Sequence, residues 1–308
     1  MATMVGSGSH TYEVAEGWGQ LPEGIKYGYT HGVVVDKQDN VYIHNQSKDA
    51  VIVFNRDGKF IKSWGAEFAG GAHGMLLHTE NGKEFLYLAD PARHIMVKTT
   101  LDGEVVYTLK MPDRKDIYAS DAEYKPTETC VAPNGDVYVT DGYGKSWIHH
   151  YDSKGNYKTS FGGPAGSEKG QTKCPHGVRI IQRGGKTELY CADRGNNRFQ
   201  IFSLDGKHLR FVTDELRYPC CFYQWHDEIY IPDLHSRVTV FDKNDKLITH
   251  LGDTPDGWKK PKWPNVEPEE LKVGKFSSPH NCCVDSRGDV YVAEWIAVGR
   301  VTKLIRQK

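Results

Sequence analysis

Length, composition and charge limit what this chain can be. Its 308 residues are 38% apolar, which is enough to bury one large core or two ordinary ones. Lysine plus arginine (39) nearly balances aspartate plus glutamate (40), so the chain lacks the basic field with which proteins bind nucleic acid. No stretch approaches the roughly 20 apolar residues of a membrane span. We expect a soluble protein with no nucleic-acid partner.

The chain opens with a segment, residues 1–10, that is rich in glycine and serine and that we interpret as linker-like. It carries no signal-peptide pattern. If a leader has been removed, the protein is secreted or periplasmic, and otherwise it is cytoplasmic. The seven cysteines form no CxxC pair, and their odd number leaves at least one thiol unpaired, so they do not decide the compartment.

From His31 onward the chain repeats a pattern of short apolar runs separated by polar turns. The first copy reads HGVVVDKQDNVYIHNQSKDAVIVFNRDGKFIKSW, in which four runs have the length and composition of strands. Successive copies start roughly 40 to 60 residues apart, close to the period of four-stranded propeller blades. The six copies begin at His31, His73, Thr127, His176, Cys220 and His280. We therefore predict an all-β, six-bladed β-propeller that forms a single domain over residues 11–308.

The sixth copy ends after three strands, which would leave an unpaired edge. The segment TYEVAEGWG, residues 11–19, resembles the fourth-strand phrase GKFIKSWG at residues 58–65. We predict that this N-terminal strand completes the sixth blade and closes the ring, because closure removes the exposed edges.

The residue that enters the first strand of each repeat would lie at one mouth of the propeller channel, and the six such residues would form a ring. We call these six places the ring positions. Alternate blades of a six-bladed ring are related by three-fold symmetry, so His73, His176 and His280 are predicted to converge. Three histidines are an established ligand set for zinc, and another divalent metal is also open. Alternatively, each histidine hydrogen-bonds to neighbouring backbone. The other ring positions, His31, Thr127 and Cys220, are candidates for supporting the ligands or contacting the substrate, and a structural role is equally open.

The connections between the second and third strands are expected at the same mouth. An acid recurs there, and we predict that it binds backbone amides at the turn; the acids are Asp90, Asp141, Asp193, Asp233 and Glu294. Tyr143 and Arg194 occur at this turn in one repeat each, so the repeat does not require them, and they are the candidate catalytic residues. The insertion at 254–278 is either a substrate lid or a loop packed on the propeller flank.

The repeat phrase resembles the NHL-repeat family, whose members form six-bladed β-propellers. Over residues 70–308 the chain also resembles the catalytic core of the peptidyl-α-hydroxyglycine α-amidating lyases. The matching phrases, in the same order, are AHGM with YLADPARHIMVK, KPTETCVAPNGDVYVTDGYGKSWI, CPHGV with CADRGNNRFQIF, and SPHNCCVDSRGDVYVAE.

The resemblance implies a role for each candidate residue. His73, His176 and His280 would bind zinc, Tyr143 would be the catalytic base, and Arg194 would contact a substrate carboxylate. The implied reaction cleaves the N–Cα bond of a peptidyl-α-hydroxyglycine, giving an amide and glyoxylate, with a small molecule or a peptide end as substrate.

The chain also departs from the family pattern. Asn281 stands where the family has an aspartate, which removes a charge from the structural calcium site that the resemblance implies. Gly144 and Cys191 do not match the family's paired cysteines. Two alternatives stay open: another metal-dependent reaction at the same site, such as isomerisation, epimerisation or hydrolysis, or a non-catalytic NHL propeller that binds proteins or ligands.

Overall fold

The computed structural model describes residues 2–307 and is built from antiparallel sheets. Alternating apolar residues and polar turns fold each repeat into a four-stranded meander, so the predicted six-bladed, all-β propeller is confirmed as the fold class. Within the described residues the helical segments are five short 3-10 turns. None of these segments is long and apolar enough to cross a membrane.

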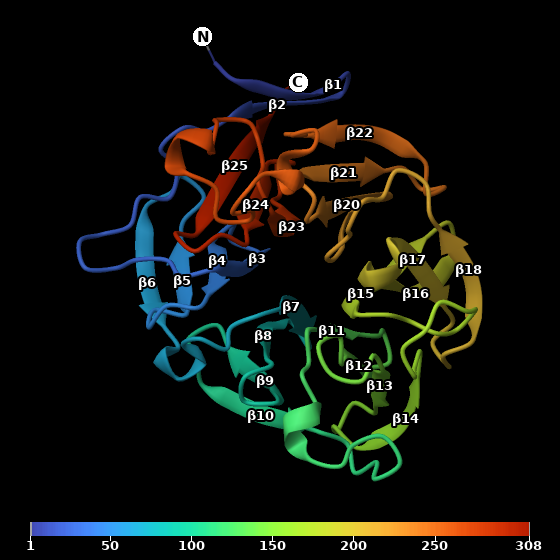
Figure 1. Cartoon of the computed structure of the whole chain (residues 1–308). Helices are drawn as coiled ribbons and strands as arrows, with labels where there is room; N and C mark the ends of the chain where they lie inside the picture. Colours follow the sequence, from blue (N-terminus) through green and yellow to red (C-terminus); the bar gives the residue numbers. More distant parts are fainter. Residues whose placement is uncertain (1, 308) are drawn as a thin grey trace. The chain divides into compact units, whose positions relative to one another are not determined.

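The chain divides into two compact units, which are described separately here. The first unit contains the residues up to Gly70 and those from Phe222 onward, and the second is Gly71–Cys221. Each unit holds three complete sheets (Figure 1).

The second unit contains the second, third and fourth repeats. Its first sheet is formed by β7 (Met75–Glu80), β8 (Lys83–Asp90), β9 (Ile95–Thr100) and β10 (Val105–Lys110). The next is formed by β11 (Glu128–Val131), β12 (Val137–Thr140), β13 (Ile148–Tyr151) and β14 (Tyr157–Phe161). The last is formed by β15 (Pro175–Arg183), β16 (Lys186–Asp193), β17 (Arg198–Phe202) and β18 (His208–Val212). Two 3-10 turns lie in this unit, η2 (Asp121–Glu123) and η3 (Arg194–Asn196).

The first unit contains the first, fifth and sixth repeats. One sheet is formed by β3 (Thr30–Val35), β4 (Val41–Asn45), β5 (Val51–Phe54) and β6 (Phe60–Trp64). A second is formed by β19 (Tyr223–Trp225), β20 (Glu228–Asp233), β21 (Arg237–Phe241) and β22 (Leu247–Leu251). The third has five strands in the order β1 (Met4–Ser7), β2 (His10–Val14), β25 (Arg300–Arg306), β24 (Val290–Glu294) and β23 (Pro279–Val284). Its 3-10 turns are η1 (Ala66–Phe68), η4 (Gly257–Lys259) and η5 (Pro268–Glu270).

The sixth repeat is completed from the N-terminal end of the chain, as predicted. Strand β2 pairs antiparallel with β25, with Tyr12 opposite Arg306 and Val14 opposite Leu304 (Figure 1). Strand β1 then adds a fifth strand outside β2. The segment interpreted as linker-like therefore contains a short strand at Met4–Ser7.

The apolar cores lie between neighbouring sheets of each unit. In the second unit, Leu76 and Tyr87 pack with Val137 and Tyr151, which joins the first two sheets. In the first unit, Val33 and Phe54 pack with Tyr291 in the same way. Within residues 2–307 the seven cysteines form no disulfide bond, and all of them except Cys174 are buried. The cores are thus held by packed aliphatic and aromatic side chains without disulfide bonds.

Candidate active site

His73 and His176 occupy equivalent positions in the second unit. His73 lies two residues before β7 and His176 is the second residue of β15, and the two are 1% and 2% exposed. The Nδ1 of His73 bonds the carbonyl oxygen of Thr127 at 2.7 Å, and that of His176 bonds the carbonyl oxygen of Cys220 at 3.0 Å. A carbonyl can only accept, so Nδ1 carries the hydrogen, and in the neutral ring Nε2 presents its lone pair.

A glycine follows each of these two histidines, and close backbone approach explains why. A Cβ atom on Gly74 would lie 2.3 Å from the carbonyl oxygen of Thr127, and one on Gly177 would lie 2.4 Å from that of Cys220. These are the same two carbonyl oxygens that accept the histidine hydrogen bonds. The His-Gly pairs therefore let each imidazole reach the backbone that enters the next repeat.

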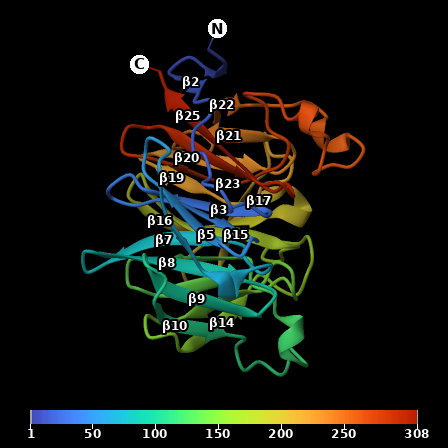
Figure 2. The same ribbon diagram turned by 90° about the vertical axis from the view of Figure 1, so that its left-hand side faces the viewer.

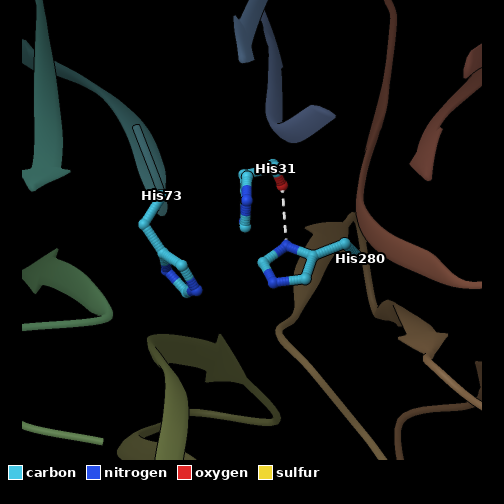
Figure 3. Close-up of side chains that lie close together, drawn as sticks. All are labelled: His31, His73 and His280. Carbon is cyan, nitrogen blue, oxygen red and sulfur yellow. Dashed lines mark hydrogen bonds between the residues drawn. The ribbon is translucent and has the colours of Figure 1, made fainter. Parts of the chain in front are cut away.

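His280 in the first unit follows the same pattern. Its Nδ1 donates to the carbonyl oxygen of His31 at 2.8 Å, and the two ring centroids are 4.6 Å apart (Figure 3). Figure 3 also draws His73, which belongs to the other unit. All three predicted metal ligands thus have Nδ1 fixed by the carbonyl of the residue at the next ring position, an arrangement that orients metal-binding histidines in proteins.

Tyr143 lies on the connection between β12 and β13, with its hydroxyl directed at the two imidazoles of the second unit. The hydroxyl oxygen is 3.0 Å from Nε2 of His73 and 3.0 Å from Nε2 of His176. The phenol has one hydrogen and can donate it to only one of these nitrogens. Two lone-pair nitrogens therefore converge on the place where the tyrosine oxygen lies.

Arg194 begins η3, on the equivalent connection between β16 and β17, and is 6% exposed. Its Nη2 donates to the hydroxyl of Tyr143 at 3.3 Å. Within residues 2–307 its hydrogen-bond acceptors are this hydroxyl and the sulfur atoms of Cys174 and Cys220, and its Nε has no acceptor. A buried guanidinium with no carboxylate partner is suited to bind an anionic group.

Burial controls the ionisation of Tyr143. Although 40% of the residue is exposed, its hydroxyl lies among the imidazoles and Arg194. Desolvation raises the pKa of Tyr143 to about 12, and the positive charge of Arg194 opposes this rise. In the protein alone Tyr143 is therefore protonated at neutral pH.

The recurring acids Asp90, Asp141, Asp193 and Glu294 bind backbone amides, as predicted. The hydrogen bonds of Asp141 and Asp193 fix the connections that carry Tyr143 and Arg194. Asp141 accepts from the amides of Lys125 at 2.7 Å and Lys145 at 2.6 Å, and Asp193 accepts from that of Lys173 at 2.6 Å. Burial raises the pKa of Asp141 to about 6, against the hydrogen bonds that it receives. In the first unit, Glu294 accepts from the amide of Ser277 at 2.7 Å.

The insertion at 254–278 packs on its own unit. The ring of Trp258 stacks on His235 with centroids 4.2 Å apart. The ring of Trp263 meets His235 edge-on with centroids 5.7 Å apart. In Figure 2 the orange segment that carries η4 and η5 protrudes beyond β21 and β22. Flank packing is thus observed for both tryptophans, and a lid function stays a prediction.

The two remaining ring positions of the second unit are also buried around this site. The sulfur of Cys220 accepts from Nη1 of Arg194 at 3.8 Å and lies within 4.8 Å of a ring nitrogen of His176. The hydroxyl of Thr127 donates to the carbonyl oxygen of Pro175 at 3.1 Å, a structural contact that leads to His176.

Two residues of the site were not expected from the sequence. Cys174 and Tyr218 both contact the guanidinium of Arg194. One signal in the sequence points to Cys174: in the phrase CPHG it directly precedes the Pro-His pair that contains His176.

The residues present fit a divalent metal ion of the zinc type. Neutral imidazoles with Nδ1 fixed by a carbonyl and Nε2 directed at a common point are usual zinc ligands, and Cys220 adds a sulfur that such an ion also accepts. This fit concerns the donor atoms of His73, His176 and Cys220, which all belong to the second unit.

Comparison with known proteins confirms the predicted resemblance. The chain is 25% identical over 216 residues to the NHL repeat-containing protein 3 of Homo sapiens, covering 63% of this chain and 57% of that protein. It is 29% identical over 159 residues to a probable peptidyl-alpha-hydroxyglycine alpha-amidating lyase of Caenorhabditis elegans, covering 50% of this chain and 43% of that protein. It is 26% identical over 262 residues to the peptidyl-alpha-hydroxyglycine alpha-amidating lyase 1 of Drosophila melanogaster, covering 77% of this chain and 45% of that protein. The chain spans about half the length of these relatives, and no family model matches it.

Solved structures agree on the fold. A streptogramin B lyase superposes with a TM-score of 0.63 at 11% identity, covering 92% of this chain and 95% of its own. A gluconolactonase of Xanthomonas campestris superposes with a TM-score of 0.64 at 14% identity, covering 97% of this chain and 91% of its own. At these identities the structures establish only the propeller fold, and it is the lyase-named sequence relatives that support an enzyme.

Proposed function

We propose that this chain is a metal-dependent lyase that cleaves the N–Cα bond of an N-acylated α-hydroxyglycine, releasing an amide and glyoxylate. The observation that carries the proposal is the hydroxyl of Tyr143, which lies 3.0 Å from Nε2 of both His73 and His176 and within 3.3 Å of Arg194. A proton acceptor, two metal-type imidazoles and an anion-binding guanidinium are the groups that this cleavage needs. The amidating-lyase relatives add support from sequence.

We propose His73, His176 and His280 as the metal ligands and zinc as the first candidate. The basis is their shared place in the repeat and the Nδ1-to-carbonyl bond that each of them makes. When bound, the ion would act as a Lewis acid that lowers the pKa of the substrate hydroxyl. The structural calcium ion implied by the resemblance stays a prediction.

Arg194 would bind the carboxylate of the substrate. Its guanidinium can donate two parallel hydrogen bonds to a carboxylate, and no acid of the chain competes for them within residues 2–307. Burial strengthens this charge interaction, because the surroundings screen it less than water does. The carboxylate would then hold the neighbouring α-carbon close to Tyr143.

Tyr143 would move the proton. Its phenolate accepts the hydrogen of the substrate hydroxyl, and the electron pair of that O–H bond forms the new C=O bond of glyoxylate. The N–Cα bond breaks, its electron pair moves onto the amide nitrogen, and the phenol returns the proton to that nitrogen. Because the pKa of Tyr143 is about 12 even with Arg194 beside it, the phenolate depends on further positive charge, which a bound metal ion would supply.

The direct test is product analysis with N-benzoyl-α-hydroxyglycine and zinc-supplemented protein. We expect benzamide and glyoxylate in equal amounts, formed faster than in buffer and faster than with Tyr143→Phe. A different product would favour an isomerase, epimerase or hydrolase. Decay at the buffer rate would overturn the lyase proposal and favour a binding propeller.

A further inference from the structure

Cys174 lies where the two connections that carry Tyr143 and Arg194 meet. Its amide donates to the Oγ of Ser146, on the Tyr143 connection, at 3.3 Å. Its carbonyl oxygen accepts from the amide of Arg194 at 3.2 Å, and its sulfur accepts from Nη2 of the same residue at 3.3 Å. One residue thus contacts both connections through its backbone and one of them through its side chain.

The backbone of Cys174 adopts a conformation that is unfavourable for cysteine. Its φ of 53° lies in the left-handed region, which residues other than glycine, asparagine and aspartate rarely adopt. Ser146, its partner, has a φ of 64° and is in the same region. Such conformations persist where surrounding contacts enforce them, and they are concentrated at functional sites.

The contacts of Arg194 hold the guanidinium without neutralising it. Its central carbon lies 5.4 Å from the ring centroid of Tyr143 and 5.0 Å from that of Tyr218, and its nitrogens donate to Cys174 and Cys220. A carboxylate at the position of Cys174 would hold the group as firmly but would also cancel its charge. A thiol sulfur is a weaker hydrogen-bond acceptor than a carboxylate, so it competes less with an anion for the guanidinium.

We infer that Cys174 is a positioning residue that fixes the guanidinium of Arg194 and preserves its charge for the carboxylate of the substrate. This inference rests on the proposed function for the role of Arg194. If Cys174 has this role, it is a determinant of specificity, because the enzyme then favours substrates that carry a carboxylate over analogues that do not.

The test uses substitutions that separate side chain from backbone. Cys174→Gly removes the sulfur and suits a positive φ, so the protein should remain folded. We expect the KM for N-benzoyl-α-hydroxyglycine to rise about tenfold with a much smaller change in kcat, since a hydrogen bond to a charged group is lost. Cys174→Ser should restore most of the affinity. Cys174→Asp, whose residue type tolerates the same φ, should raise KM further by pairing with Arg194.

Two controls complete the kinetic test. The carboxamide analogue of the substrate should be turned over equally by wild type and Cys174→Gly, because it offers no carboxylate to Arg194. Cys130→Ala removes a buried thiol that is 1% exposed and packs in an apolar cluster, and it should leave KM unchanged. An unchanged KM in Cys174→Gly, or an equal loss with the carboxamide, would overturn the inference.

A measurement independent of activity separates this inference from the proposed function. The Nε–Hε signal of Arg194 in a nitrogen-15 NMR spectrum, assigned with Arg194→Lys, should shift in Cys174→Gly but not in Cys130→Ala. If wild type shows no lyase activity and the signal still shifts, the proposed function fails while the positioning contact holds. An unshifted signal contradicts the positioning role whether or not the enzyme is active.

Discussion

The hydroxyl oxygen of Tyr143 lies 3.0 Å from Nε2 of His73. The same oxygen lies 3.0 Å from Nε2 of His176, and both imidazoles are fixed from behind by carbonyl oxygens. The tyrosine is thus held by two acceptors that compete for its single hydrogen. This arrangement places a proton-transferring group and two metal-type ligands at one point, with Arg194 beside them.

Removing only the hydroxyl of Tyr143 tests its catalytic role. We expect Tyr143→Phe to lower kcat by about 100- to 10,000-fold, the usual contribution of a general acid or base. Metal content should not change, because the imidazoles keep their Nδ1 bonds to Thr127 and Cys220. Turnover of N-benzoyl-α-hydroxyglycine and elemental analysis on the same sample give the two readings. Undiminished kcat would remove Tyr143 as the proton acceptor.

Arg194 is expected to affect both substrate binding and the pKa of Tyr143. Arg194→Gln removes the charge that opposes desolvation, so the pKa of Tyr143 should rise above its value of about 12 in the metal-free protein. Carbon-13 NMR of labelled tyrosine, with Tyr143→Phe for assignment, follows this titration. The KM for the carboxylate substrate should rise by at least about tenfold. A pKa that stays constant or falls would show that the guanidinium does not act on the phenol.

Glu128 is a buried acid that the proposed chemistry does not use, and it should make stability depend on pH. Burial raises its pKa to about 7, so between about pH 4.5 and 7 the folded protein holds a proton that the unfolded chain has lost. Stability should therefore fall as pH rises through this window, by up to about 3 kcal/mol. Glu128→Gln should raise the urea midpoint at pH 8 and change it little at pH 4.5.

The matched control for that experiment is Glu123→Gln in the same unit. A hydrogen bond from Lys145 lowers the pKa of Glu123, so its ionised form favours the folded state above its unfolded pKa, and this contribution is lost as pH falls. The control variant should not gain stability at pH 8. Equal behaviour of the two variants would contradict the role assigned to the burial of Glu128.

The repeats and the ring positions could be predicted from sequence because both depend on local patterns. Alternating apolar residues and turns specify each sheet, and the similarity of residues 11–19 to a fourth-strand phrase located β2. From the sequence, each histidine was open to a hydrogen bond with backbone, but the carbonyl of Thr127 could not be named as the partner of His73, because that choice depends on how closely two sheets approach each other. Cys174 was missed for a related reason, since its left-handed backbone follows from contacts with Ser146 and Arg194.

The most direct test of a metal-dependent site is the metal content of purified, tag-free protein after zinc is supplied. We predict about one ion per chain in wild type, with loss of the ion and of lyase activity in His73→Ala, His176→Ala and His280→Ala. His150→Ala should keep the ion, because Nε2 of His150 bonds a carboxylate oxygen of Asp136 at 2.8 Å instead. Absence of metal from zinc-supplied wild type, or full retention by His176→Ala, would contradict the account.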